Sequence, residues 1–221
     1  MALGGLPVGP TVTGVLSLDD VCLDGRTVLL RVDVNSPLNP ETMEFMDDRR
    51  FTEFLSTLEA LSSSKVVIIS HQSRPGYLDF TSTEPHSVLL SSLIGRPVGF
   101  VSDVCGEDAI SAIKGMDDGD VLFLDNVRKH EEEISMKRAS PEEMANSEIV
   151  RNLSAVIDAY VTDAFATAHR SSPSLTGFAG EVPCIAGRLM KKEINALRTA
   201  VFDPPRPYVV ILGGIKCDDS L

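Results

Sequence analysis

The sequence has no long apolar run, no close pair of cysteines and no secretion signal. No stretch approaches the roughly 20 consecutive apolar residues that a membrane-spanning helix needs. The start, Met1–Gly14, lacks the basic segment of a signal peptide, so we expect a cytoplasmic protein. The four cysteines lie far apart, which argues against a zinc knuckle or a redox motif and predicts buried or inert thiols.

An excess of basic residues is also missing. The formal net charge is −12 and the isoelectric point is about 4.7. Nucleic acids and anionic membranes bind basic protein surfaces, so this composition argues against both as partners. Any basic character that matters for function must therefore be local. With 221 residues, 43% of them apolar, the chain is long enough for one large domain, or for one domain and part of another.

Short apolar runs alternate with amphipathic segments along the chain. This alternation predicts an α/β fold, a Rossmann-like three-layer αβα sandwich with a mostly parallel sheet. Residues 167–183 are rich in Ser, Thr, Gly and Pro and are expected to form a loop. We predict strands over residues 27–30, 65–69, 97–101, 121–124 and 156–161, and helices over residues 49–61, 83–93, 107–114, 141–153 and 188–201.

One helix start is marked clearly in the sequence. Ser140-Pro141-Glu142-Glu143 is a capping box with proline at the first helical position. Met144, Ile149 and Leu153 continue the apolar stripe, so we predict a single helix from there to the next strand.

The last segment of the chain predicts the start of another folding unit. Prolines at positions 204, 205 and 207 end the last helix. Tyr208–Leu212 then predicts a new buried strand, and Gly213-Gly214 a sharp turn. A strand so near the end has few residues to pack against. We therefore expect a truncated chain in which a second α/β domain only begins.

Four of the predicted strands lead directly into clusters of polar residues. In parallel sheets such residues meet at the carboxyl ends of the strands, where open α/β sheets bind ligands. The sequence therefore predicts one crevice with a local excess of positive charge. The clusters are Arg31–Asn35, Ser70–Pro75, Asp125–Arg128 and Thr162–Arg170.

The residue types in these clusters indicate a small polyanion as the ligand. Arginine presents a planar fork that matches the oxygens of carboxylates and phosphates. Arg50 joins them from the first turn of a predicted helix, where it is either a surface charge or faces an anion across the crevice. The alternative is that each arginine pairs with a carboxylate in a structural ion-pair network. The candidates are Asp33, Asn35, Arg50, His71, Arg74, Asp125, Asn126, Arg128, Asp163, His169 and Arg170.

Two other chemistries fit the sequence less well. His71, His169, Asp33 and Asp163 are ordinary metal ligands, but no two have the close helical spacing of a metalloprotease motif. Nearby arginines would also repel a cation, so we expect no metal there. A hydrolase is not expected because no serine lies in a Gly-x-Ser-x-Gly elbow.

At these residues the sequence resembles phosphoglycerate kinase, from about Leu16 to the end of the chain. Six segments of that family occur here in order, and the combination is far more specific than any one of them. They are Arg-Val-Asp-x-Asn at 31–35, Asp-x-Arg at 48–50, Ser-His-x-x-Arg-Pro at 70–75, Asn-x-Arg at 126–128, Asp-Ala-Phe-x-x-Ala-His-Arg at 163–170 and Gly-Gly-x-Lys at 213–216.

The resemblance implies a kinase that transfers a phosphoryl group between ATP, bound with Mg²⁺, and 3-phosphoglycerate. It implies that residues 1–187 form the 3-phosphoglycerate-binding domain, that 188–207 form an interdomain helix and hinge, and that 208–221 begin a nucleotide-binding domain. It also favours a monomer. A non-catalytic relative that binds a phosphometabolite remains the alternative.

The resemblance also implies roles for single residues. Asp33, Asn35 and Arg50 hold the hydroxyl and carboxylate end of the substrate, and Arg50 is catalytic. The phosphate is held by His71, Arg74, Arg128 and Arg170, with His169 in support. Gly213, Gly214 and Lys216 contact the nucleotide. We further expect His71 to bind phosphate as an imidazolium, so that affinity falls as pH rises through the histidine range.

The sequence departs from the family pattern at a few positions. Asp125 and Lys129 stand for the usual Glu and Phe around Asn126, Thr162 stands for Asn, and Ser172 stands for a second His. Asp219-Ser220, in place of Asp-Lys, is similar to archaeal members. These changes leave the arginines intact.

Overall fold

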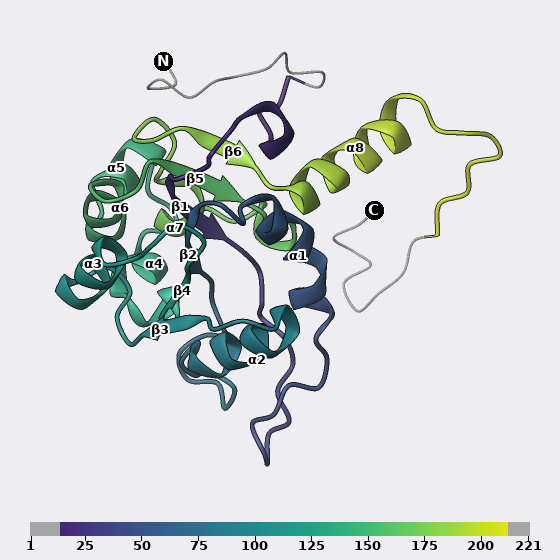
Figure 1. Ribbon diagram of the computed structural model, residues 1–221. Helices are drawn as coiled ribbons and strands as arrows, with labels where there is room; N and C mark the ends of the chain where they lie inside the picture. Colours follow the sequence, from purple (N-terminus) through teal and green to yellow (C-terminus); the bar gives the residue numbers. More distant parts are fainter. Residues whose placement is uncertain (1–13, 212–221) are drawn as a thin grey trace.

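The computed structural model describes residues 14–211. In that part of the chain six parallel strands form one sheet in the order β3-β4-β2-β1-β5-β6 (Figure 1). The α/β fold with a parallel sheet is confirmed. The strands are β1 (Thr27–Arg31), β2 (Lys65–Ile69), β3 (Gly99–Val101), β4 (Val121–Leu124), β5 (Ala159–Thr162) and β6 (Cys184–Ala186).

Helices cover both faces of this sheet, which makes the three layers that the sequence predicts (Figure 1). Alternate strand residues point to opposite faces. Val28 and Leu30 pack with α1 and α2, whereas Leu29 packs with α3 and α6. The α-helices are α1 (Arg49–Ala60), α2 (Glu84–Ile94), α3 (Glu107–Lys114), α4 (Glu131–Ser135), α5 (Pro141–Ala145), α6 (Glu148–Ser154), α7 (Pro173–Thr176) and α8 (Arg188–Phe202), and the short 3₁₀ helices are η1 (Leu18–Asp20), η2 (Val127–Lys129) and η3 (Phe165–Thr167).

The sheet order brings the four predicted polar clusters together. The strands that precede these clusters are β1, β2, β4 and β5, and they are neighbours in the sheet. Since all of them run parallel, the four segments that follow them leave the sheet at the same edge.

The prediction of one helix over residues 141–153 is wrong. The chain forms α5 and α6 there, with a break at Asn146 and Ser147. The Ser147 side chain accepts a hydrogen bond from the backbone N–H of Val150, so it caps a new helix in the middle of the predicted one. The apolar stripe survives the break because Met144, Ile149 and Leu153 are all buried.

The sequence patterns also missed several short elements and misplaced strand ends. Helix α7 lies within the expected loop over residues 167–183, and helix α4 and strand β6 lie where no helix or strand was predicted. Strand β3 begins at Gly99 instead of residue 97, and β5 at Ala159 instead of residue 156. Elements of three to five residues are too short to show a hydrophobic period.

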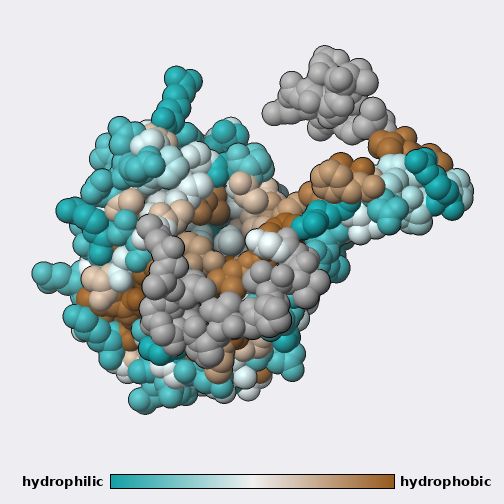
Figure 2. Space-filling model, turned by 90° about the horizontal axis from the view of Figure 1, so that it is seen from above, coloured by the Kyte–Doolittle hydropathy of each residue, from teal (hydrophilic) through white to brown (hydrophobic). Residues whose placement is uncertain are grey.

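The last described segment differs from its prediction. Helix α8 begins at Arg188 as expected and projects from the body of the molecule, with apolar residues on its surface (Figures 1 and 2). Residues 208–211 form no strand and are exposed, so the expected buried strand is wrong for them. A strand needs a neighbouring strand to pair with, and residues 14–211 place none beside this segment. Leu212, Gly213, Gly214 and Lys216 lie outside the described residues.

No helix within residues 14–211 is both long and apolar enough to cross a membrane.

Candidate functional site

The segments that follow β1, β2, β4 and β5 surround a cavity of about 730 Å³. This cavity lies at the carboxyl ends of the strands, so the predicted crevice is present. It also takes residues from α4 and from the segment around α7. The polar side chains that line it are Arg31, Asn35, His71, Ser73, Arg74, Tyr77, Asp79, Arg128, Glu133, Lys137, Thr167, Arg170, Ser171 and Ser172.

Positive charge predominates in the cavity wall. Five cationic side chains, from four arginines and Lys137, face two acidic ones, Glu133 and Asp79. Burial lowers the pKa of Arg128, and the nearby charges of Arg170 and Arg31 lower it further. These side chains therefore repel one another, and an anion between them would relieve that repulsion.

The alternative of a structural ion-pair network holds for one arginine of the set. Nη1 of Arg50 lies 2.8 Å from Oδ2 of Asp33. Within residues 14–211, the arginines that line the cavity form no such ion pair with a carboxylate: these are Arg31, Arg74, Arg128 and Arg170. The positive charges of Arg74, Arg128 and Arg170 are therefore available to a ligand, whereas all three nitrogens of Arg31 already donate within the protein.

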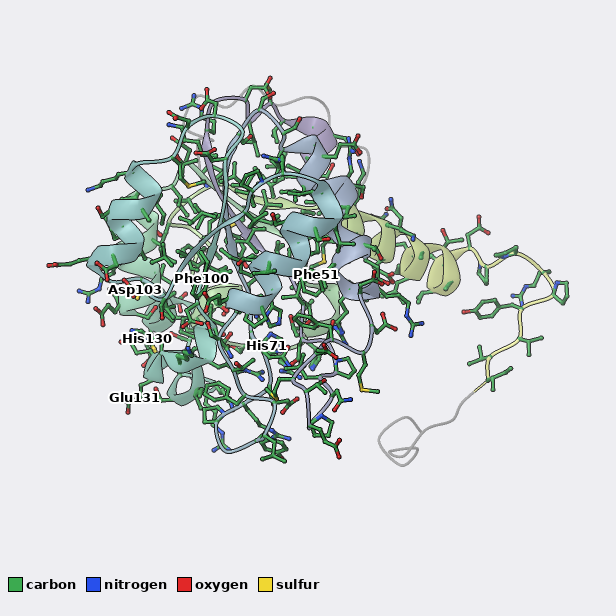
Figure 3. All side chains as sticks on the ribbon, turned by 60° about the horizontal axis from the view of Figure 1, so that its bottom comes forward. Phe51, His71, Phe100, Asp103, His130 and Glu131 are labelled. Carbon is green, nitrogen blue, oxygen red and sulfur yellow. The ribbon has the colours of Figure 1, made fainter. Side chains whose placement is uncertain are left out.

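His71 follows β2 at the cavity wall and is almost completely buried (Figure 3). Its Nδ1 atom lies 3.2 Å from Nη2 of Arg31. A guanidinium can only donate, so Nδ1 accepts the hydrogen bond and the ring proton is on Nε2. Burial, and then the charges of Arg31, Arg128, Arg170 and Arg50, lower the pKa of His71 far below its ordinary value.

These surroundings argue against the expectation that His71 acts as an imidazolium. The ring is neutral in the neutral pH range of the free protein, because a protonated ring would place a second positive charge next to that of Arg31. The Nε2 atom is buried and has no hydrogen-bond partner among the described residues. That N–H remains as the donor that His71 offers to a ligand.

The three candidates for the hydroxyl and carboxylate end do not all line the same cavity: they are Asn35, Asp33 and Arg50. Asn35 lines the large cavity and its Oδ1 accepts a hydrogen bond from the backbone N–H of Ser73 at 2.7 Å. Asp33 accepts one from the backbone N–H of Asn35 at 3.1 Å. Asp33 and Arg50 line a neighbouring cavity of about 150 Å³, together with Asp163.

The remaining candidates differ in position. Arg74 lies at the rim, where its guanidinium carbon is 4.4 Å from the centre of the Tyr77 ring. Arg128 donates to the backbone oxygen of Ser73, and Arg170 is exposed at the cavity. His169 is exposed and lines neither cavity.

Three candidates hold loops and helices in place. Asn126 donates to the backbone oxygens of Gln72 and Thr81, each at 2.8 Å. Asp125 accepts from the backbone N–H of Thr83 at 3.1 Å. Asp163 accepts from the backbone N–H of Met190, at the start of α8, at 2.9 Å.

Sequence reasoning missed three residues at the centre of the site. Arg31 is the last residue of β1 and contacts His71, while Glu133 and Ser174 lie behind it. An arginine at the end of a buried strand is a signal that was available. Glu133 carried no signal, because it is one of three consecutive glutamates that read as a solvated helix surface.

Among the described residues, no three His, Cys, Asp or Glu side chains lie close enough together to hold a metal ion.

Comparisons with known proteins agree on one family. The family model described as phosphoglycerate kinase matches residues 18–221. A phosphoglycerate kinase of Methanothermobacter thermautotrophicus is 45% identical over 207 residues, which are 93% of this chain and 50% of that relative. The chain thus spans about half the length of the curated relatives it matches.

Solved structures give the same result. The crystal structure of phosphoglycerate kinase from Pyrococcus horikoshii OT3 matches with a TM-score of 0.88 and 42% identity, over 93% of this chain and 50% of that one. The structure of the Coxiella burnetii phosphoglycerate kinase matches over the same shares, with a TM-score of 0.72 and 29% identity.

Proposed function

The chain belongs to the phosphoglycerate kinase family, and from that premise we propose that it binds 3-phosphoglycerate in the large cavity at the carboxyl ends of β1, β2, β4 and β5. The observation that carries this proposal is the set of four arginines that line the cavity without a carboxylate partner among residues 14–211. A small molecule with a phosphate and a carboxylate would supply the negative charge that these arginines do not find in the protein.

The proposed contacts follow the two ends of the substrate. Arg74, Arg128 and Arg170 bind the phosphate by charge, and His71 donates to it from Nε2. Asn35 and Asp33 bind the hydroxyl group. Since His169 lines neither cavity, we give it no direct contact.

Arg50 is proposed to bind the reacting carboxylate. It belongs to the first turn of α1, and its side chain is half-buried beside the smaller cavity. To bind the substrate, Arg50 must break its ion pair with Asp33 and form one with the substrate carboxylate. The contact with the carboxylate would then form in the reacting state, and we propose that Arg50 is catalytic.

The proposed reaction of the full-length protein is reversible phosphoryl transfer between ATP and the carboxylate of 3-phosphoglycerate, which gives 1,3-bisphosphoglycerate and ADP, as in glycolysis and gluconeogenesis. Such a transfer depends on positioning and on neutralising the charge of the moving phosphoryl group. The attacking carboxylate is already ionised at neutral pH, so the protein needs no general base.

The nucleotide is proposed to bind mainly outside the described residues. We propose that residues 1–187 form the acid-binding domain, 188–207 the interdomain helix and hinge, and 208–221 the start of a nucleotide-binding domain. Gly213, Gly214 and Lys216 are proposed to contact the phosphates of Mg²⁺-bound ATP. The exposed apolar side chains of α8, Leu197, Val201 and Phe202, support a contact with further protein there. Our expectation for the full-length protein remains a cytoplasmic monomer.

A coupled assay with ATP and 3-phosphoglycerate tests this function. We expect turnover by a protein that joins this chain to a nucleotide-binding domain, and no turnover by this chain alone, because closing domains must hold the two substrates in line. Binding of 3-phosphoglycerate without turnover by the full-length protein would instead identify a non-catalytic relative. Turnover by the 221-residue chain would place the nucleotide site within it.

A further inference from the structure

A chain of buried hydrogen bonds connects Glu133 to His71. Oε1 of Glu133 accepts from the Ser174 hydroxyl at 2.7 Å, and Oε2 accepts from the Ser174 backbone N–H at 2.9 Å. The Ser174 Oγ atom in turn accepts from Nε of Arg31 at 3.2 Å. Nη2 of Arg31 reaches Nδ1 of His71 at 3.2 Å. All four side chains are at most 5% exposed.

The direction of each bond in this chain is fixed by chemistry. Arginine only donates and an ionised carboxylate only accepts, so the Ser174 hydroxyl must accept from Arg31 and donate to Glu133. Arg31 is held at three points, because its Nη1 atom also donates to the backbone oxygen of Val32. Its planar fork therefore presents Nη2 to His71 in one orientation.

We propose that Glu133 and Ser174 are positioning residues for substrate binding: through Arg31 they hold His71 in its neutral form with the proton on Nε2, and this N–H donates to the substrate phosphate. The identity of the ligand, 3-phosphoglycerate, is taken from the proposed function. The arrangement of the four side chains in the free protein does not depend on that identity.

The charged groups around His71 explain why a relay is needed. Arg31, Arg50, Arg128 and Arg170 all act on the ring, and together they oppose a positive charge on it. These charges alone do not choose between the two neutral tautomers. The donor from Arg31 makes Nδ1 the acceptor, and Ser174, held by Glu133, fixes the direction of that donor together with the backbone oxygen of Val32.

Nitrogen NMR of the His71 ring in the 221-residue chain tests the proposal directly. We expect an Nδ1 signal typical of an unprotonated nitrogen and an Nε2 signal typical of N–H, with neither titrating between pH 6 and pH 8. In Ser174→Ala the hydroxyl that accepts from Arg31 is lost, and we expect the two tautomers to mix. The affinity for 3-phosphoglycerate should weaken by about fivefold, the size of one net hydrogen bond.

Ser172→Ala is the matched control. The Ser172 hydroxyl donates to the same Glu133 oxygen at 2.7 Å and is also buried, but within the described residues it makes no contact with Arg31. This variant should keep the wild-type tautomer, because Ser174 still accepts from Arg31 in it. If Ser172→Ala changes the ring signals as much as Ser174→Ala does, the effect is general loosening and the proposal is wrong.

Glu133→Gln gives a second route if Ser174→Ala does not fold. The carboxamide places an NH₂ group where Glu133 now only accepts, so the bonds to Ser174 must rearrange and the tautomers should again mix. An unchanged His71 spectrum in the folded variant would overturn the relay. If the tautomer changes as expected but wild-type protein does not bind 3-phosphoglycerate, the relay stands and the proposed function fails.

Discussion

Nη1 of Arg50 lies 2.8 Å from Oδ2 of Asp33, which ties the first turn of α1 to the segment that follows β1. The Asp33 side chain is nearly buried, whereas that of Arg50 is 39% exposed. Arg50 is thus held beside the site by a carboxylate on one side and is open on the other. In the proposed function, a substrate carboxylate replaces Asp33 as the partner of this guanidinium.

This relationship makes Arg50→Ala a specific test. In the full-length protein we expect kcat to fall about a hundredfold, with a smaller change in KM, because the contact forms only when the carboxylate reacts. Arg49→Ala is the matched control, since Arg49 is exposed and pairs with Asp47. Steady-state kinetics that show a raised KM and an unchanged kcat would assign Arg50 to ground-state binding alone.

The neutral ring of His71 predicts how substrate affinity depends on pH. We expect the affinity for 3-phosphoglycerate to stay flat between pH 6.5 and pH 8 once the titration of the ligand is subtracted, because His71 carries no charge in that range. Calorimetric titrations across the range measure this, with the exposed His169→Gln as the control. A steady loss of affinity with rising pH that disappears in His71→Gln would show that His71 binds the phosphate as an imidazolium.

His86 predicts a loss of stability in acid. It is buried against Phe45 and Phe51, its Nε2 lies 3.1 Å from Oε1 of Gln72, and burial lowers its pKa to about 4. Below the unfolded-state pKa of about 6.5, the unfolded chain binds a proton that the folded chain excludes. Stability contributed by the neutral ring is therefore full above pH 6.5 and is lost as pH falls toward 4, by about 3 kcal/mol in total.

Urea unfolding at several pH values between 7 and 4 measures this effect. The free energy of unfolding of His86→Gln should fall less steeply with acid than that of wild type. His169→Gln should match the wild-type slope, because the ring of His169 is exposed. Equal slopes in wild type and His86→Gln would show that another group causes the acid sensitivity.

Asp163 predicts an increase of stability on neutralisation. Its carboxyl group is buried at the start of α8, and burial raises its pKa. A raised pKa in the folded state means that stability is lost as pH rises above 3.8 and the carboxyl group ionises. Asp163→Asn keeps an acceptor for the backbone N–H of Met190 and removes the charge, so its urea midpoint at pH 7 should be higher than that of wild type.

Comparing Asp163→Ala with Asp163→Asn separates the effect of the charge from that of the hydrogen bond to Met190. Asp163→Ala removes both, and the lost hydrogen bond at the helix start should lower stability by about 1 kcal/mol relative to Asp163→Asn. Gly187 leaves room for this contact, because a Cβ atom there would overlap the Asp163 side chain. If Asp163→Asn is less stable than wild type at pH 7, the carboxylate has a partner that compensates its burial.

The sequence was sufficient to predict five of the six strands and the end of the sheet where the polar clusters meet. The runs at residues 65–69 and 121–124 match β2 and β4 residue for residue, because buried parallel strands are short apolar runs that polar residues end. The same logic predicted that Asn35, His71, Arg74, Arg128 and Arg170 would share one cavity, which they do.

The sequence was not sufficient where side chains decide the outcome. Ser147 breaks a continuous apolar stripe by capping its own helix, and the pattern of apolar residues is the same with or without that break. The charge state of His71 depends on its burial and on the charge of Arg31, which is 40 residues away in the chain. Glu133 and Ser174 are 41 residues apart, and only the fold brings them together.

Calorimetric titration of the 221-residue chain with 3-phosphoglycerate, in low and in high salt, tests the central claim most directly. We predict measurable but weak binding that salt weakens further, and a loss of about tenfold or more in Arg74→Ala and in Arg170→Ala, which each remove a charge-assisted contact from the cavity. Arg26 directly precedes β1 and pairs with Asp158, so Arg26→Ala should bind as wild type does. No binding in low salt by the folded chain, or unchanged binding in both cavity variants, would contradict the assignment of this cavity to the substrate.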